Sequence, residues 1–403
     1  MKILVFTQFY HPEPGATSNR LKSLVDALVN RGHDVTVICE FSNHPNGVLA
    51  KEDKWKVYMV EDKGNHRIIR TFVIPFKKKN IITRLIFYSS FAISSFIAGL
   101  IVKKHDIVLS SSPPPFHVYL ALLLSKIKRS KFVYDVRDLL TRAAQEMNVV
   151  NNGMILNLTK KIDACLYKNA NILITVTQGF KKVISNEVNR EKIFVIQNGS
   201  DIDMMNWDGN VENIRNKMGW ENKIVVTFAG NIGVPQAIPK LIKEISTIED
   251  DRLQFVLIGD GPLKDYVTRI ANNSNLSNIL LLGQIPRSEV IPLTHASDIM
   301  LISLEELEVF KITIPSKFYD SMAAGKPVLS NVDGELKNIM EKHKTGLHFS
   351  FNNSGSFKKS LMKLVDDERL RIEYGANGKS IVKERFLRNK LGDKFVDIIE
   401  KVK

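Results

Sequence analysis

The chain has 403 residues, a formal net charge of +14 at pH 7 and a hydrophobic content of 44%. This length favours two domains, and the composition is that of an ordinary globular protein with a sizeable core. The two cysteines, Cys39 and Cys165, exclude a disulfide framework and favour a reducing cytosol.

The positive charge is confined to one half of the chain. Residues 1–200 carry all of the +14, and residues 201–403 sum to zero. The segment 67–131 holds twelve basic residues against one acid, Asp106. A solvated basic surface remains open, but the alternative is attraction to an anionic surface. No zinc-ligand spacing or nucleic-acid module accompanies the charge, so we expect a membrane surface and no nucleic acid.

Two apolar segments bear on targeting. The run at 1–6 is too short for a signal peptide and predicts a buried first strand. The stretch from Leu85 to Val102 contains no charge, but four serines dilute it and a membrane span needs ~20 apolar residues. A buried helix is therefore expected, with a helix at the membrane interface as the alternative.

Strand-like and helix-like segments alternate along the chain, which is typical of parallel sheets with helices on both faces. In the first half the predicted strands are 2–6, 35–38, 107–110, 131–135, 172–176 and 194–197. The predicted first helix is 19–31, and Gly32 follows it where a helix end favours a left-handed residue.

The pattern is interrupted at 198–213, which is rich in Asn, Asp, Gly and Ser. A second series follows, with strands predicted at 224–229, 253–258, 279–282, 299–303 and 327–330. Its predicted helices are 235–245, 263–272, 288–295 and 316–324. We therefore expect an α/β protein with two Rossmann-like, doubly wound parallel-sheet domains, 1–200 and 201–380, facing a central cleft. Residues 381–403 are expected to form a helix that packs back toward the first domain.

Two segments of the first half have the composition of a ligand site. In the loop 10–20, Gly15 and Ala16 allow close approach of a ligand, and Thr17 or Ser18 is expected to cap the following helix. The loop lacks the G-x-G-x-x-G pattern, which argues against a nicotinamide enzyme; a plain capped turn stays open.

The second segment is 134–138, at the end of a predicted strand. Strand alternation puts Asp135 and Arg137 on one face, and Asp138 begins the loop. These side chains could orient a sugar hydroxyl, activate an acceptor, or form an ion-paired turn.

Three segments of the second half predict a phosphate-binding edge. The turns at 228–236 and 257–262 are each glycine-rich and lie between a strand and a helix, although tight turns alone would explain them. The third segment, 312–327, begins a helix with Pro315 and Ser316. Lys317 lies in the first turn, where the positive end of the helix dipole disfavours a cation. A bound diphosphate would compensate both positive charges. Asp320, one turn later, could accept hydrogen bonds from ribose hydroxyls.

Taken in order, the motifs resemble those of the large family of retaining glycosyltransferases numbered four. The resemblance covers nearly the whole chain, and its motifs are PEPGATSNR (12–20), RGHDVTV (31–37), YDVRDL (134–139), QNGSDID (197–203), FAGNIGVPQAI (228–238), LIGDGPL (257–263) and PSKFYDSMAAGKPVL (315–329). Within the family, the chain looks most like bacterial O-antigen and capsule enzymes of the L-fucosamine transferase type.

The resemblance implies a GT-B fold and a metal-independent, retaining transfer from a UDP-sugar, with no cofactor. The implied donor-binding residues are Gly15, Ala16, Gly230, Asn231, Gln236, Gly259, Asp260, Ile285, Pro315, Ser316, Lys317 and Asp320.

The chain departs from the family pattern at several positions. Asp320 matches the second acid of the family's E-x7-E motif, but Ile312 occupies the position of the first, and Glu305, Glu306 and Glu308 are out of register. Asn231 and Gln236 replace the usual Arg and Lys, which increases the importance of Lys317.

The implied catalytic residues are Asp138, Asp135 and Arg137; Arg137 stands where many relatives carry a histidine. In a front-face transfer the leaving phosphate can itself accept the acceptor proton, so the protein supplies mainly positioning and charge stabilisation.

We therefore expect a hexosyltransferase-type enzyme of cell-surface polysaccharide synthesis, such as O-antigen, capsule or lipopolysaccharide. It would act on a polyprenyl-diphosphate-linked or growing glycan acceptor at the inner face of the cytoplasmic membrane, as a peripheral protein. A UDP-sugar 2-epimerase and a non-catalytic nucleotide-sugar-binding protein are the alternatives. The sequence determines neither the donor sugar and base, nor the acceptor, the linkage or the oligomeric state.

Overall fold

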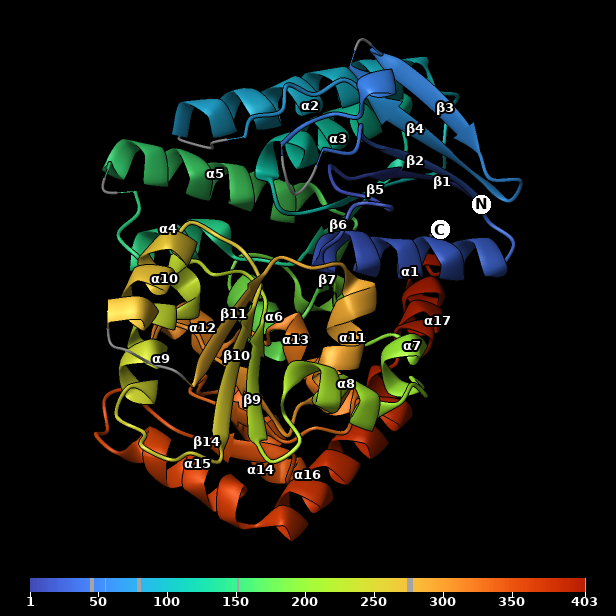
Figure 1. Cartoon of the computed structure of the whole chain (residues 1–403). Coiled ribbons are helices and arrows are strands. Elements are labelled where there is room, and N and C mark those ends of the chain that lie inside the picture. The colour runs from blue at the N-terminus through green and yellow to red at the C-terminus, as the bar shows by residue number, and fades with distance from the viewer. Residues whose placement is uncertain (44–46, 55, 78–80, 151, 274–277, 403) are drawn as a thin grey trace. The chain divides into compact units, whose positions relative to one another are not determined.

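The chain divides into two units in the computed structural model, which describes residues 1–43, 47–54, 56–77, 81–150, 152–273 and 278–402 (Figure 1). Unit 1 comprises Met1–Gln197 and Asn389–Lys403, and unit 2 comprises Asn198–Arg388. The divisions therefore fall after residues 197 and 388, against the expected 200 and 380.

Unit 1 is built on an eight-stranded sheet in the order β3-β4-β2-β1-β5-β6-β7-β8. Its strands are β1 (Lys2–Phe6), β2 (Asp34–Glu40), β3 (Tyr58–Asp62), β4 (His66–Thr71), β5 (Ile107–Ser111), β6 (Lys131–Val136), β7 (Ile172–Thr175) and β8 (Ile193–Val195). All neighbouring pairs are parallel except β3 and β4. The central strands are buried almost from end to end, as expected for a parallel sheet covered on both faces.

The helices of unit 1 are α1 (Ala16–Asn30), α2 (Ile81–Ile101), α3 (Pro115–Lys128), α4 (Leu140–Glu146), α5 (Gly153–Asn169), α6 (Gln178–Ile184) and the C-terminal α17 (Arg388–Ile399). Short 3-10 turns occupy Lys51–Asp53 and Arg190–Lys192. Phe395, Val396 and Ile399 of α17 are buried in the same core as Leu21, Leu24, Val25 and Leu28 of α1. The C-terminal helix is thus part of the core of unit 1.

Unit 2 is built on a six-stranded parallel sheet in the order β11-β10-β9-β12-β13-β14. Its strands are β9 (Ile224–Ala229), β10 (Leu253–Ile258), β11 (Ile279–Gly283), β12 (Ile299–Ile302), β13 (Val328–Ser330) and β14 (Gly346–His348). Val226 and Phe228 of β9 face one core, and Val225 between them packs with Trp220 in another. Helices therefore cover both faces of this sheet, as the sequence predicts.

The helices of unit 2 are α7 (Ile202–Met205), α8 (Val211–Met218), α9 (Ile238–Ile245), α10 (Lys264–Asn273), α11 (Arg287–Ala296), α12 (Glu308–Lys311), α13 (Ser316–Ala323), α14 (Glu335–His343), α15 (Ser356–Asp366) and α16 (Glu368–Ile381). A 3-10 turn occupies Val234–Gln236 and a π-helical turn occupies Val382–Phe386.

Two local expectations are wrong. The helix expected over 235–245 is interrupted at Ala237, whose φ of 50° ends the 3-10 turn before α9 begins. The expected cap of α1 by Thr17 or Ser18 is absent, because α1 begins at Ala16 with Gly15 as its N-cap. Gly32 does adopt the predicted left-handed conformation, with φ of 84°.

Helix α2 is long and apolar enough to cross a membrane, by length and composition. Phe87, Phe91, Ala92 and Ala98 are buried, whereas Ile82, Ile93, Ile97 and Ile101 are more than half exposed. One third of its most apolar window is buried inside the protein. The helix therefore has one face packed inside the protein and one exposed apolar face.

Candidate functional site

In unit 2, two glycine turns meet at the carboxyl ends of β9 and β10. Gly230 and Gly259 have φ values of 149° and 144°, which favour glycine. A Cβ on Gly259 would lie 1.9 Å from the carbonyl oxygen of Gly230, so the two backbones are in direct contact. The N–H of Gly230 donates to the carbonyl of Ile258 at 2.8 Å. Both predicted donor-binding glycines thus form one backbone surface at the edge where ligands bind in such sheets.

Lys317 of α13 lies beside this surface. Its Nζ lies 3.6 Å from the centroid of the Phe228 ring, and a Cβ on Gly230 would approach Nζ to 2.8 Å. The Nζ atom is buried and has no hydrogen-bond partner among the described residues. Burial lowers the pKa of Lys317 to about 7. A buried cation without an anionic partner, next to glycine backbone, is what a phosphate site requires.

Asp320, one turn further along α13, is already engaged. One carboxylate oxygen accepts a hydrogen bond from the hydroxyl of Ser200, and the other lies 3.3 Å from Nη1 of Arg287. Arg287 is the first residue of α11, and its Nη2 also lies 3.0 Å from Asp201. A ribose that bonds to Asp320 would therefore share it with, or displace, Ser200 and Arg287.

Arg287 and the residues linked to it were not predicted from the sequence. Asp201 also pairs with Arg388, whose backbone N–H donates to the carbonyl of Ser200 at 3.0 Å. Ser200 forms a parallel bridge with Leu387. The motif QNGSDID contains Ser200 and Asp201 and is the available signal, but nothing in the sequence pairs it with Arg287 or Arg388.

The other predicted donor-binding residues of unit 2 have varied surroundings. The side-chain amides of Asn231 and Gln236 bond each other at 3.1 Å across the 3-10 turn. Asp260 is exposed and accepts the N–H of Gly261 at 2.7 Å. Ile285 packs with the core that contains Trp220. Pro315 is the N-cap of α13 and Ser316 its first residue, directly before Lys317.

The acids near Ile312 serve other contacts. Glu305 pairs with Lys240, and Glu308 pairs with Lys311. Glu306 accepts hydrogen bonds from Ser350 and from the backbone of Phe351. These contacts support the conclusion that none of the three replaces the missing first acid of the E-x7-E motif.

In unit 1, Asp135 is fully buried and held by Arg20. The guanidinium of Arg20 donates from Nε at 3.1 Å and from Nη2 at 2.9 Å to the two carboxylate oxygens. Ser111 donates to the same carboxylate at 2.9 Å, and Nη1 of Arg20 donates to the carbonyl of Gln197 at 2.8 Å. Since Asp135 has no exposed surface, we infer a structural role in place of the expected contact with the acceptor.

Arg137 and the loop before α1 are also connected. Nη1 of Arg137 donates to the hydroxyl of Thr17, and its backbone N–H donates to Ser112 at 3.4 Å. Gly15 has φ of 133°, and apart from its chain neighbours no atom of the described residues lies within 4 Å of where its Cβ would be. Gly15 and Ala16 thus begin α1 with open space beside the backbone, and Arg137 fixes the residue that follows them.

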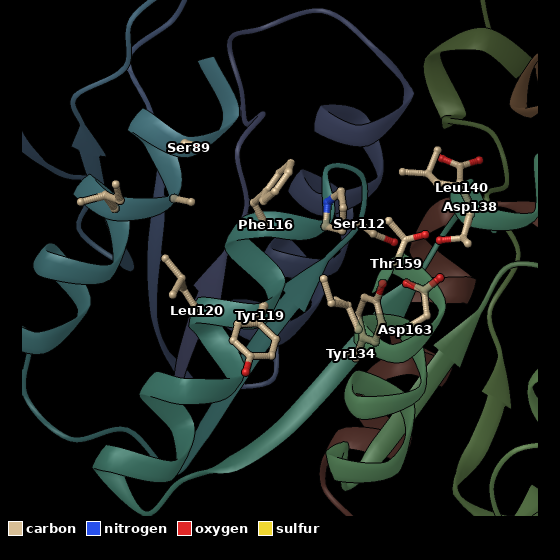
Figure 2. A pocket seen from close by; sticks show the side chains of 15 residues that line it. Ser89, Ser112, Phe116, Tyr119, Leu120, Tyr134, Asp138, Leu140, Thr159 and Asp163 are labelled. Carbon is tan, nitrogen blue, oxygen red and sulfur yellow. The ribbon is translucent and has the colours of Figure 1, made fainter. Parts of the chain in front are cut away.

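Asp138 lies at one end of a pocket of about 300 Å³ within unit 1 (Figure 2). The lining residues come from α2, the loop after β5, α3, the end of β6, α4 and α5: Ser89, Ala92, Ile93, Ser112, Pro115, Phe116, Tyr119, Leu120, Tyr134, Asp138, Leu140, Thr141, Thr159, Ile162 and Asp163. Burial raises the pKa of Asp163, and a hydrogen bond with Thr141 opposes the rise. No lysine or arginine in the described parts of the chain pairs with Asp138 or Asp163 at ion-pair distance.

Among the described residues, no group of three or more His, Cys, Asp or Glu side chains could hold a metal ion. The metal independence implied by the resemblance stays a prediction.

Two family models match the chain in succession. Residues 17–204 match the model described as "Glycosyltransferase Family 4", and residues 210–381 match "Glycosyl transferases group 1". WbjE of Pseudomonas aeruginosa, named as a probable glycosyltransferase, is 26% identical over 66% of this chain and 66% of its own length. WcaI of Escherichia coli K12, named for glycosyl transfer in colanic acid biosynthesis, is 23% identical over 81% of this chain and 82% of its own length.

Solved structures share the fold. HepE of Anabaena, in complex with UDP and glucose, has a TM-score of 0.73 at 16% identity, and the similarity covers 100% of both chains. The predicted α/β fold with two parallel-sheet domains of GT-B type is therefore confirmed.

Donor affinity should depend on pH through Lys317. The free ammonium has a pKa near 7, and a bound diphosphate would raise it, so binding takes up a proton above pH 7. Below pH 7 the lysine is already charged and contributes no pH dependence. Calorimetry with a UDP-sugar should show affinity falling by up to about tenfold per unit above about pH 7.

The matched variant is Lys317→Arg, which stays charged and should flatten this profile. The expected proton uptake is measured by repeating the titration in buffers of different ionisation enthalpy. Equal wild-type affinity at about pH 6.5 and about pH 8.5 would contradict a direct contact between Lys317 and the donor.

Asp135→Asn should lower the free energy of unfolding by about 3–5 kcal/mol, because it leaves the buried guanidinium of Arg20 without its counter-charge. Urea unfolding followed by circular dichroism measures the loss. The control is Lys22→Ala, which breaks an exposed pair with Asp26 and should leave the curve unchanged. A normal unfolding curve for Asp135→Asn, with loss of turnover alone, would restore the catalytic role.

Proposed function

We propose, from the premise that the chain is a glycosyltransferase of the GT-B fold, that it transfers a hexosyl group from a UDP-sugar to a lipid-linked or growing glycan acceptor, with retention of configuration. The observation that supports the donor assignment is the buried, unpartnered ammonium of Lys317 beside Gly230 and Gly259. UDP in the complex of HepE supports a uridine nucleotide for this chain also. An N-acetylated deoxyhexosamine such as L-FucNAc is our proposed donor sugar.

In the proposed reaction, the bond from the anomeric carbon to the diphosphate oxygen breaks, and a bond to the acceptor oxygen forms on the same face. A phosphate oxygen of the leaving UDP takes the acceptor proton, so no side chain need act as the base. Lys317, beside the glycine turns, would stabilise the charge on UDP, and Asp320 would hold the ribose. Asp138, exposed at the strand end of unit 1, would orient the acceptor hydroxyl.

The proposed place of action is the inner face of the cytoplasmic membrane, with peripheral attachment through unit 1. The basic segment 67–131 and the exposed apolar side chains of α2 support this proposal. The relatives named for polysaccharide synthesis support a lipid-linked acceptor, for which we propose a polyprenyl-diphosphate-linked glycan of O-antigen or capsule type.

The transfer is tested by donor binding and by acceptor-dependent release of UDP. A panel of nucleotides and nucleotide sugars should raise the melting temperature only for uridine diphosphates, because a ligand that binds the folded protein stabilises it. UDP release should then require a lipid acceptor. Release without acceptor would favour the epimerase, and binding without transfer to any lipid-linked acceptor would favour a non-catalytic binding protein.

In the same assay Asp138→Asn should reduce kcat by about 10²-fold and change the donor KM little. The control Glu52→Gln neutralises an exposed acid of the same unit and should have no effect. Full turnover by Asp138→Asn would remove Asp138 from the mechanism.

Membrane attachment is tested by sedimentation with lipid vesicles. The protein should sediment with vesicles that contain phosphatidylglycerol and less with neutral vesicles, and added salt should weaken the anionic component. Complete solubility at physiological salt in the presence of anionic vesicles would contradict peripheral attachment.

A further inference from the structure

The pocket in unit 1 has two chemically different ends (Figure 2). Near the carboxyl end of β6 the lining carries the polar side chains of Ser112, Asp138, Thr141, Thr159 and Asp163, together with Tyr134, Leu140 and Ile162. Toward α2 and α3 its lining is apolar or aromatic, with Ala92, Ile93, Pro115, Phe116, Tyr119 and Leu120. A ligand that fills such a pocket must itself be apolar at one end and hydrogen-bonding at the other.

The apolar end opens to the surface. Ile93, Phe116 and Tyr119 line the pocket and are nevertheless 58%, 42% and 45% exposed, so they mark a mouth at this end, while Asp138 and Leu140 are exposed at the other end. Around Ile93, Phe116 and Tyr119, helices α2, α3 and α5 lie side by side in unit 1 and present further exposed apolar side chains (Figure 1). These are Leu85, Ile86, Ile97, Leu100, Leu123, Ile127, Met154, Ile155 and Leu158. A cluster of this kind on a protein surface marks an interaction site, because water disfavours it.

Charge on the same three helices complements an anionic lipid surface. The exposed lysines Lys126, Lys160 and Lys161 lie on α3 and α5, and Arg84 lies on α2. Apolar side chains with a basic border are typical of proteins that bind at the membrane interface. The mouth of the pocket therefore opens on the surface best suited to meet a lipid.

The polar end is unsuited to a phosphate. Asp138 and Asp163 bring two carboxyl groups; neither has an ion-pair partner among the described residues, and while burial raises the pKa of Asp138, the nearby charge of Arg137 lowers it. Like charges in a partly dehydrated pocket repel strongly. Hydroxyl groups, by contrast, donate to carboxylates and also bond the hydroxyls of Ser112, Thr141 and Thr159.

We propose that this pocket binds the hydrocarbon chain of a lipid acceptor and holds an uncharged, hydroxylated head beside Asp138 and Asp163. The chain enters between Ile93, Phe116 and Tyr119. The assignment of the ligand as the acceptor rests on the proposed transfer, whereas the binding itself does not. In a polyprenyl-diphosphate-linked acceptor the diphosphate joins the chain to the glycan and would therefore lie between the chain and the head.

The test uses n-dodecyl-β-maltoside below its critical micelle concentration, titrated calorimetrically into the whole protein. Saturable binding of one detergent molecule per chain is expected, and maltose, which lacks the chain, should not bind. Dodecyl phosphate should bind at least about tenfold more weakly than the maltoside because of the two carboxyl groups. Equal or tighter binding of dodecyl phosphate would overturn the assignment of the head.

Two substitutions on α2 separate the pocket from the surrounding surface. Ile93 and Ile97 are 58% and 52% exposed on the same helix, but only Ile93 lines the pocket. Ile93→Asn should weaken maltoside binding by about tenfold, and Ile97→Asn should change it less than about twofold. Equal losses in both variants would show adsorption to the surface only and would overturn the pocket.

The fold of each variant is checked by the UDP-induced rise in melting temperature, which depends on unit 2. The two proposals also fail differently. Maltoside binding without any UDP release in the presence of lipid acceptors contradicts the proposed transferase reaction but leaves the pocket. Acceptor-dependent UDP release without maltoside binding contradicts the pocket alone.

Discussion

The buried ion pair between Arg20 and Asp135 is the interaction on which the ligand-facing edge of unit 1 depends. One guanidinium joins α1 to β6 and to the carbonyl of Gln197, the last residue before the chain passes into unit 2. The carboxylate accepts two of these bonds and a third from Ser111 of β5. Removal of either partner would leave a buried charge without its counter-charge. The pair therefore holds α1 and β6 together, and with them the loop that ends at Gly15 and the loop that begins at Asp138.

In unit 2 the ligand-facing edge is formed by backbone contacts and not by an ion pair. Gly230 and Gly259 pack so closely that no side chain fits between them, and this leaves the buried ammonium of Lys317 as the cation beside the turn. The cost of keeping that ammonium dehydrated is expressed as its lowered pKa, and an anionic ligand would relieve it. The two ligand-facing edges thus differ: in unit 1 the buried charges of Arg20 and Asp135 are paired, whereas in unit 2 the buried ammonium of Lys317 has no hydrogen-bond partner among the described residues.

Local patterns in the sequence predicted the features that depend on neighbours in the chain. Alternation of apolar runs predicted the central strands of both sheets but missed β3, β4 and β14, and the rule against a cation at a helix start identified Lys317. Features that depend on distant residues were not accessible in this way. Strand alternation gave the face of Asp135, but its partner lies 115 residues earlier, and the pairing of Arg287 with Asp201 and Asp320 spans 86 and 33 residues. The break at Ala237 was missed because alanine has no local preference for a left-handed conformation.

The bridge between Ser200 and Leu387 has a mechanical consequence. The chain passes between the units twice, after Gln197 and after Arg388, and this bridge ties the two crossing segments together at the boundary of unit 2. Arg388 pairs with Asp201, and Arg287 joins Asp201 to Asp320 on α13. A ligand that changes the bonding of Asp320 would therefore act on the same contacts that hold the two ends of unit 2 together.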